Sequence, residues 1–233
     1  MITITQFGSC RSNCANSLYK STGLNEVISY THTTKEHLQL LDFIEGRKEF
    51  PYPFNRYCFR TSIISQPSNV EWRASYAEAL KSTDLFLVEL CSTRLYMHSN
   101  YYLHHLAVDR RFDYWRNTDP EFDARSRMFR QDEGELEEEM LELEHRLRKP
   151  MIFLTHFDAG VNGMPLLLRR RELIQAVERI GRCHGLHVFN PSVVLGKYKQ
   201  SEVLDADAGH YTMTGTMAVG ELLSNKIKEV LCL

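Results

Sequence analysis

Residues 84–91 read DLFLVELC, and this stretch decides the fold. The run is apolar almost throughout, whereas a strand with one solvated face alternates between apolar and polar residues. Continuous apolar runs of this length are typical of strands buried on both faces, as in a parallel sheet covered by helices. Residues 151–155, MIFLT, repeat the pattern. Together the two stretches predict an α/β fold.

Strand and helix patterns alternate along much of the remaining chain, as expected for a parallel sheet. Two capping-box spacings, Thr33 to Glu36 and Ser68 to Glu71, predict helix starts. Residues 51–69, rich in Pro, Asn and Ser, are interpreted as a long loop with one strand at most. Further strands are expected at residues 2–7, 27–30 and 186–189, and helices at residues 11–20, 165–183 and 214–230. The helices that begin at the two capping boxes are expected to reach residue 44 and about residue 81.

Residues 94–149 interrupt this alternation, and we interpret them as a helical insertion within a single domain of residues 1–233. The first part is aromatic and basic. The second part, residues 132–148, is a charged helix with a narrow apolar stripe, which predicts packing onto the domain core. A homodimer seam and a lid over a binding site are the alternatives. The stripe consists of Leu136, Met140, Leu143 and Leu147.

The composition narrows the class of protein. Apolar residues make up 43% of the chain, which is enough for a sizeable core. The formal net charge of −2 gives no overall positive potential that would attract nucleic acid. No apolar run approaches the roughly 18 residues that span a membrane. The N-terminus lacks the features of a signal peptide, and the six cysteines form no zinc-like pattern. We therefore expect a cytoplasmic protein with free thiols and no membrane span.

Two short motifs at opposite ends of the sequence carry candidate chemistry. Gly8-Ser9-Cys10 follows the first strand, and Asp207-Ala208-Gly209-His210 precedes the last helix. A serine hydroxyl becomes a nucleophile when a histidine accepts its proton and a carboxylate orients that histidine. Gly8 permits a sharp turn, and backbone N–H groups at Ser9 are expected to stabilise an oxyanion.

This ordered set resembles the GDSL/SGNH hydrolase superfamily, including the Tyr211-Thr212 pair that follows His210. Gly8-Ser9-Cys10 looks like the opening of the GSCFA-type branch. The resemblance implies a flavodoxin-like three-layer sandwich with a parallel sheet of about five strands. It also implies Ser9 as nucleophile, His210 as base and Asp207 as the residue that orients the base.

The sequence departs from the family at the block Gly-x-Asn-Asp, which supplies an asparagine to the oxyanion hole. Residues 89–92 read Glu-Leu-Cys-Ser at the corresponding place. The side chains of Asn13, Ser92 and His156 are candidate substitutes. Losing one such donor costs about 100- to 1000-fold in rate in a well-studied protease.

Two neighbours of Ser9 offer alternative roles. Cys10 is a rival nucleophile, because a thiol at a helix N-terminus has a lowered pKa. Its alternative role is that of a small buried residue. The guanidinium of Arg11 is suited to an anionic substrate or to a structural ion pair. Arg169-Arg170-Arg171 is interpreted as a solvated helix face.

We expect neither metal nor cofactor. The sequence contains no HExxH, Walker or dinucleotide-binding motif, and its ten histidines show no spacing typical of metal ligands. Adjacent His104 and His105 would point in different directions on a helix. The expected function is hydrolysis of a small-molecule or saccharide ester by a Ser-His-Asp triad. The alternatives are an O-acyltransferase of saccharide biosynthesis and a catalytically silent binding module on the same fold.

Overall fold

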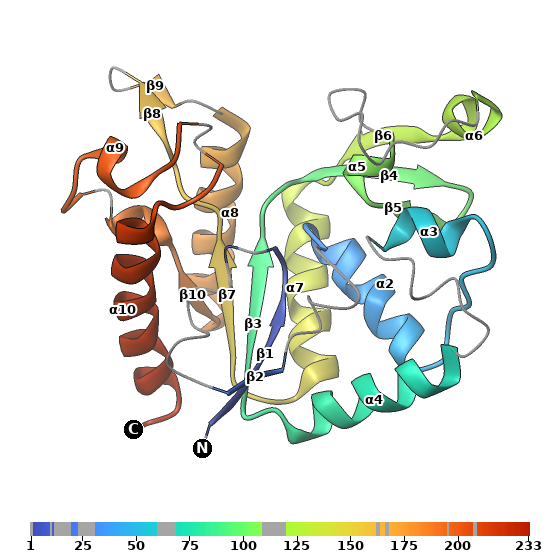
Figure 1. Ribbon diagram of the computed structural model, residues 1–233, viewed down its shortest axis with the longest axis horizontal. Helices are drawn as coiled ribbons and strands as arrows, with labels where there is room; N and C mark the ends of the chain where they lie inside the picture. Colours follow the sequence, from blue (N-terminus) through green and yellow to red (C-terminus); the bar gives the residue numbers. More distant parts are fainter. Residues whose placement is uncertain are drawn as a thin grey trace.

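A five-stranded parallel sheet forms the centre of the computed structural model (Figure 1). The structure describes residues 2–9, 11, 20–22, 31–59, 69–108, 120–161, 164–165, 168–194, 196–206 and 209–233. Its strands are β1 (Thr3–Phe7), β2 (Lys20–Thr22), β3 (Leu85–Leu90), β7 (Met151–Thr155) and β10 (His187–Phe189). The spatial order β10-β7-β3-β1-β2 is the flavodoxin-like order, which confirms the predicted fold class.

The strand β3 explains why residues 84–91 predict the fold. Side chains alternate between the two faces of a strand. Phe86, Val88 and Leu90 belong to one core cluster, and Leu85 and Leu87 belong to another. All six residues of β3 are buried, which explains why the strand is apolar at every position except Glu89.

Helices cover both faces of the sheet (Figure 1). The first core cluster takes side chains from α2 (Thr34–Ile44), α4 (Asn69–Ser82), α7 (Glu133–Leu147) and α8 (Leu168–His184). The second takes side chains from α9 (Gln200–Val203) and α10 (Met213–Val230). The Thr33–Glu36 capping box is present at the start of α2, as predicted. None of the helices that the structure describes is long and apolar enough to cross a membrane.

The segment 94–149 is only partly helical, which corrects the prediction of a helical insertion. It contains a three-stranded antiparallel sheet of β4 (Arg94–His98), β5 (Tyr101–Leu103) and β6 (Arg127–Arg130). The short helices α5 (His105–Val108) and α6 (Pro120–Arg125) lie between β5 and β6 in the chain. Aromatic residues such as Tyr96 and Tyr101 favour strands because they pack well on a pleated surface. The helix α7 lies between β3 and β7 in the chain, the place of a crossover helix in a parallel sheet.

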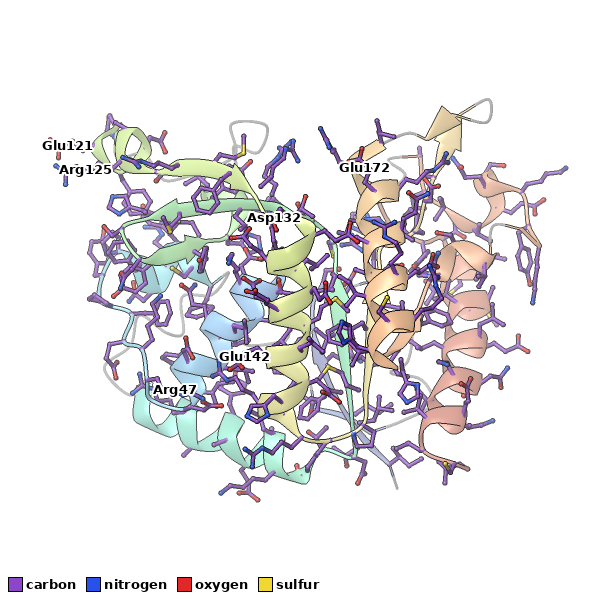
Figure 2. All side chains as sticks on the ribbon, turned by 180° about the vertical axis from the view of Figure 1, so that it is seen from behind. Arg47, Glu121, Arg125, Asp132, Glu142 and Glu172 are labelled. Carbon is purple, nitrogen blue, oxygen red and sulfur yellow. The ribbon has the colours of Figure 1, made fainter. Side chains whose placement is uncertain are left out.

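The apolar stripe of α7 faces the protein's own core. Leu136, Met140 and Leu143 are at most 2% exposed and belong to the first core cluster. The opposite face of α7 is charged, and Glu142 is exposed there (Figure 2). The core-packing interpretation of the stripe is therefore confirmed.

Smaller differences from the predicted elements have simple causes. The second strand is Lys20–Thr22, a polar edge strand without an apolar signal, and the predicted strand at residues 27–30 lies outside the described residues. The predicted loop at residues 51–69 contains the short helix α3 (Phe54–Cys58). Two β-ribbon strands, β8 (Gly160–Val161) and β9 (Met164–Pro165), and the 3-10 helix η3 (Pro191–Val194) complete the described elements.

Candidate active site

The candidate site lies where three central strands end. Ser9 follows β1, Glu89 and Cys91 stand at the end of β3, and His156 follows β7 directly. Because the carboxyl ends of parallel strands meet at one edge of the sheet, these side chains are brought together. The hydrogen bond from the His156 N–H to the Leu90 carbonyl, 3.3 Å long, fixes the ends of β3 and β7 side by side.

Gly8 creates the turn that presents Ser9. Its φ of +147° is strained for any other residue, and a Cβ atom at this position would lie 2.4 Å from Cβ of Glu89. The close approach lets the backbone N–H of Ser9 donate to Glu89 Oε2 at 2.7 Å and the Ser9 hydroxyl donate to the same oxygen at 2.6 Å. Ser9 is 3% exposed.

This geometry corrects one expectation about the oxyanion hole. The sequence predicts that the Ser9 N–H faces a reacting oxygen, but in the structure it donates to the Glu89 carboxylate. The sequence gives no sign of this contact, because Glu89 lies 80 residues from Ser9 in the chain. Glu89 is the first residue of the segment 89–92, which corresponds to the Gly-x-Asn-Asp block of the GDSL/SGNH superfamily that the sequence resembles.

Arg11 pairs with the other oxygen of Glu89. Its Nε atom lies 2.8 Å from Oε1, and the Glu89 and Arg11 side chains are 1% and 12% exposed. Burial alone raises the pKa of Glu89, but the Arg11 charge and the two Ser9 hydrogen bonds outweigh burial and hold this pKa below its usual value. Glu89 is therefore ionised at neutral pH, and an ionised carboxylate only accepts hydrogen bonds.

The guanidinium of Arg11 also connects distant parts of the chain. Nη2 lies 3.1 Å from Sγ of Cys91, and Nη1 donates to the carbonyl of Gly209 at 3.1 Å. Gly209 immediately precedes His210, the predicted base. The structure thus brings the Ser9 segment and the His210 segment together through one side chain.

His210 is exposed, and its backbone is well fixed. Its carbonyl accepts the N–H of Asp205 at 3.0 Å, Tyr211 pairs with Leu204, and Thr212 caps α10. Asp207 and two other predicted site residues, Cys10 and Asn13, lie outside the described residues. Their roles stay predictions.

His156 is buried at the carboxyl end of β7, with 4% of its surface exposed. Burial lowers its pKa, and the nearby charges of Arg11 and Arg170 lower it further. His210 contributes to the same shift, which places these groups around one region. His156 is therefore neutral at pH 7, and its Nδ1 lies 3.2 Å from the carbonyl of Phe157.

Arg170 belongs to this region, although the sequence predicted a solvated face for residues 169–171. Its guanidinium lies 5.4 Å from the centre of the Phe157 ring, and Nη1 donates to the Phe157 carbonyl at 3.5 Å. Burial and the Arg11 charge lower the pKa of Arg170 to about 10. Arg169 does fit the prediction, since it is exposed and pairs with Glu172.

Among the residues that the structure describes, Ser92 is not one of those in contact with Ser9. Its hydroxyl accepts the backbone N–H of Arg94 at 2.9 Å and so stabilises the turn into β4. The Cys91 thiol lies nearer to the site, but burial and the Glu89 charge raise its pKa, so it is a neutral thiol. A neutral thiol is a weak nucleophile.

Comparison with known proteins now places this site in a family. The family model described as TviD N-terminal domain matches residues 2–122 and 111–226. The chain belongs to the TviD N-terminal domain family. It is 24% identical to the Vi polysaccharide biosynthesis protein TviD of Salmonella typhi over an alignment of 263 residues. That alignment covers 97% of this chain and 32% of TviD, so the chain spans about a third of its relative's length.

A solved structure supports the fold as well. The lipase/acylhydrolase from Enterococcus faecalis superposes with a TM-score of 0.51, covers 98% of this chain and 96% of its own, and is 14% identical. This likeness confirms the predicted α/β fold. Membership in the SGNH hydrolase superfamily and in its GSCFA-type branch stays a prediction.

Proposed function

We propose that this TviD N-terminal domain catalyses acyl transfer to a saccharide hydroxyl, with Ser9 as the nucleophile. The observation that supports this proposal most strongly is the pair of contacts made by Arg11. Its side chain binds Glu89, which contacts Ser9, and it donates to the carbonyl of Gly209, the residue before His210. The relative TviD is named as a polysaccharide biosynthesis protein. We propose transfer first because a biosynthetic enzyme is expected to add an acyl group to a saccharide and not to remove one. Hydrolysis, in which water is the acceptor, is the second candidate and agrees with the fold of the acylhydrolase.

The proposed reaction has two halves. Ser9 Oγ attacks the carbonyl carbon of the acyl donor while the imidazole of His210 takes the hydroxyl proton. The tetrahedral intermediate collapses, His210 returns the proton to the leaving group, and the acyl group remains on Ser9. A saccharide hydroxyl then attacks the acyl-serine, His210 accepts its proton, and that proton returns to Ser9 Oγ as the ester product leaves. Asp207 is proposed to orient His210.

Glu89 is not the proposed base. Its pKa is held below the usual value, and a general base works best with a pKa near the working pH. Histidine is the side chain that most often serves as a general base, and we assign this role to His210. Glu89 instead fixes the Ser9 backbone, and the hydroxyl must turn from Glu89 toward His210 before attack. A hydrogen bond to a charged group contributes about 1.5–3 kcal/mol, so bound substrate has to offset a cost of this size.

We assign Arg170 as the oxyanion donor, in place of the asparagine that the Gly-x-Asn-Asp block supplies in the GDSL/SGNH superfamily. The Ser9 N–H is bound to Glu89, whereas the Arg170 guanidinium lies at the same edge of the sheet beside Phe157. A fixed cation in a half-buried position stabilises developing negative charge more strongly than it does in water. The substrate's carbonyl oxygen is expected to lie between Ser9 and Arg170.

Active-site labelling tests the proposal. Purified protein is treated with a fluorophosphonate, and intact mass and peptide mapping locate the modification. We expect labelling at Ser9 that is lost in Ser9→Ala and in His210→Ala but kept in Cys10→Ala. Acetyl transfer is then measured with acetyl-coenzyme A, with and without a polysaccharide acceptor.

The outcomes separate the candidates. Acetyl-coenzyme A consumption that depends on the acceptor supports transfer, and consumption without it supports hydrolysis. Labelling that Cys10→Ala abolishes and Ser9→Ala preserves contradicts the role of Ser9. A wild-type protein that neither reacts nor turns over would instead be a binding module.

A further inference from the structure

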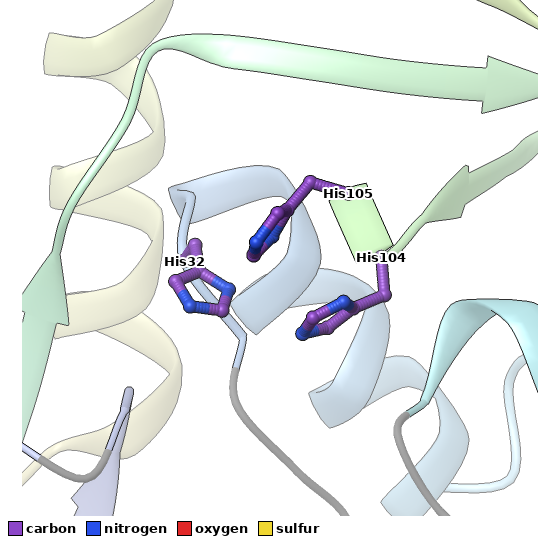
Figure 3. A group of neighbouring side chains, drawn as sticks. All are labelled: His32, His104 and His105. Atoms are coloured by element: carbon purple, nitrogen blue, oxygen red, sulfur yellow. The ribbon is translucent and has the colours of Figure 1, made fainter. Parts of the chain in front are cut away.

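Three histidine side chains, those of His32, His104 and His105, lie close together (Figure 3). His32 immediately precedes the capped start of α2, and His104 and His105 stand where β5 passes into α5. One ring nitrogen of each lies within 4.8 Å of the other two. The ring centres of His32 are 5.0 Å from His104 and 4.7 Å from His105. No metal-binding spacing is visible in the sequence, because His32 and His104 lie 72 positions apart in the chain.

The backbone holds the three side chains in place. The His32 N–H donates to Glu36 Oε2 at 2.6 Å, and the His32 carbonyl accepts the Cys91 N–H at 2.9 Å. The His104 N–H donates to the Tyr57 carbonyl at 2.8 Å. Four elements, α2, α3, β3 and β5, therefore fix the cluster. Ligands held by rigid elements are partly organised for binding before a ligand arrives.

Aromatic packing explains why the three rings are in contact, but it does not provide a hydrogen-bond partner for the buried Nδ1 atom of His32. His32 meets His104 and His105 edge to face, at interplanar angles of 74° and 87°. However, Nδ1 of His32 is buried and has no hydrogen-bond partner within the part of the chain that the structure describes. A buried polar atom without a partner is destabilising, so this atom points to a ligand.

We propose that His32, His104 and His105 bind one divalent transition-metal ion of the zinc class. Imidazole nitrogens suit zinc, copper and nickel, and three histidines with a fourth, open position form an established type of zinc site. The inference is independent of the proposed acyl transfer, and no reaction step is assigned to the metal. The ion would tie the start of α2 to the β5–α5 corner.

The geometry predicts unequal contributions from the three ligands. Zinc–nitrogen bonds of about 2.0–2.1 Å place tetrahedral ligand atoms about 3.4 Å apart, so the rings must close by up to roughly 1.4 Å. His104 Nδ1 accepts the Leu106 N–H at 3.2 Å, which leaves the hydrogen of the neutral ring on Nε2. Coordination by His104 therefore requires its ring to turn and lose this bond. His104 is the weakest of the three ligands.

Metal titration of untagged protein tests the site, since a polyhistidine tag binds the same ions. Protein stripped with a chelator is titrated with Co²⁺, and the visible absorption of tetrahedral Co²⁺ is followed before Zn²⁺ displaces it. We expect one ion per chain. His32→Ala and His105→Ala should each weaken Zn²⁺ binding by at least about 100-fold, and His104→Ala by less. His145→Ala, an exposed histidine on α7, is the matched control and should bind normally.

Far-UV circular dichroism confirms that each variant is folded. If His32→Ala does not fold, the half-buried His105 provides the decisive variant, as His105→Gln. Wild-type protein without stoichiometric binding of either ion overturns the proposal. Binding that survives in His105→Gln and in the His32→Ala/His105→Ala double variant overturns it equally, because the ion would then sit elsewhere.

Discussion

The ion pair of Glu89 and Arg11 is buried at the carboxyl end of the sheet, with side chains 1% and 12% exposed. Removing one partner of a buried pair leaves an uncompensated charge and costs about 3–5 kcal/mol. We expect Glu89→Gln to lower the free energy of unfolding by this amount, measured by urea denaturation. The double variant Glu89→Gln/Arg11→Met should recover part of the loss.

The surface pair of Arg169 and Glu172 is the matched control, since its side chains are 66% and 45% exposed. Exposed pairs contribute about 0–1 kcal/mol, so Glu172→Gln should change stability little. If Glu89→Gln and Glu172→Gln lower the free energy of unfolding by the same small amount, water must screen the Arg11 charge.

The lowered pKa of Glu89 also predicts a pH dependence. The carboxyl has an ordinary pKa of 4.5 and a lower one in the folded protein, so folding favours its ionised form. This contribution is fully present above pH 4.5 and is lost as the pH falls through the folded pKa. The difference in unfolding free energy between wild type and Glu89→Gln should therefore narrow below pH 4.5, by about 1.4 kcal/mol for each pH unit. A difference that stays constant from pH 7 to pH 3 would show that Glu89 titrates normally.

Individual residues show what the sequence can and cannot predict about a site. Ser9 and the His210 segment could be proposed from the sequence because each stands in a recognisable local pattern, a strand end and a short motif before a helix. Glu89 and Arg170 were missed because their roles depend on contacts far along the chain. The glutamate resembled an ordinary residue in a buried strand, and the arginine resembled its exposed neighbour Arg169.

At the scale of elements, burial of α7 yields a further prediction. Met140 is fully buried in the stripe, and Met→Ala changes in a core cost about 2–5 kcal/mol because they leave a cavity. We expect Met140→Ala to show this loss at every protein concentration, measured by thermal and urea unfolding. Glu142→Ala, on the exposed face of α7, should stay within about 0.5 kcal/mol of wild type. A loss that grows on dilution would instead support a homodimer seam.

Elements with strong local signals were predicted well. The strands β3 and β7 have continuous apolar runs, and α2 begins with a capping box. The edge strand β2 was missed because Lys20, Ser21 and Thr22 carry no apolar pattern, and its partner β1 supplies the pairing. The sheet of β4, β5 and β6 was missed because antiparallel pairing depends on register between distant segments.

The whole molecule brings the two ends of the chain to one place. The turn after β1 presents Ser9, and the segment before α10 presents His210, with Arg11 spanning the gap to Gly209. The sheet order makes this possible because β1 lies in the interior of the sheet, beside β3, so its carboxyl end faces the centre of the site. A flavodoxin-like sheet thus brings the segment of the proposed nucleophile, early in the sequence, close to the segment of the proposed base, late in the sequence.

Arg11→Lys tests this connection between the chain ends. The planar guanidinium bonds Glu89, Cys91 and Gly209 in fixed directions, whereas an ammonium keeps the charge without that fork. The charge on Glu89 remains compensated, so we expect a folded protein with a misplaced His210 segment. Misplacement by about 1 Å can cost roughly 100-fold, so fluorophosphonate labelling of Ser9 should slow by about 10- to 100-fold. Arg169→Lys, at an exposed position on α8, should label at the wild-type rate. A wild-type rate in folded Arg11→Lys would show that the bond to Gly209 does not position His210, and the link between the chain ends would then have to come from other contacts.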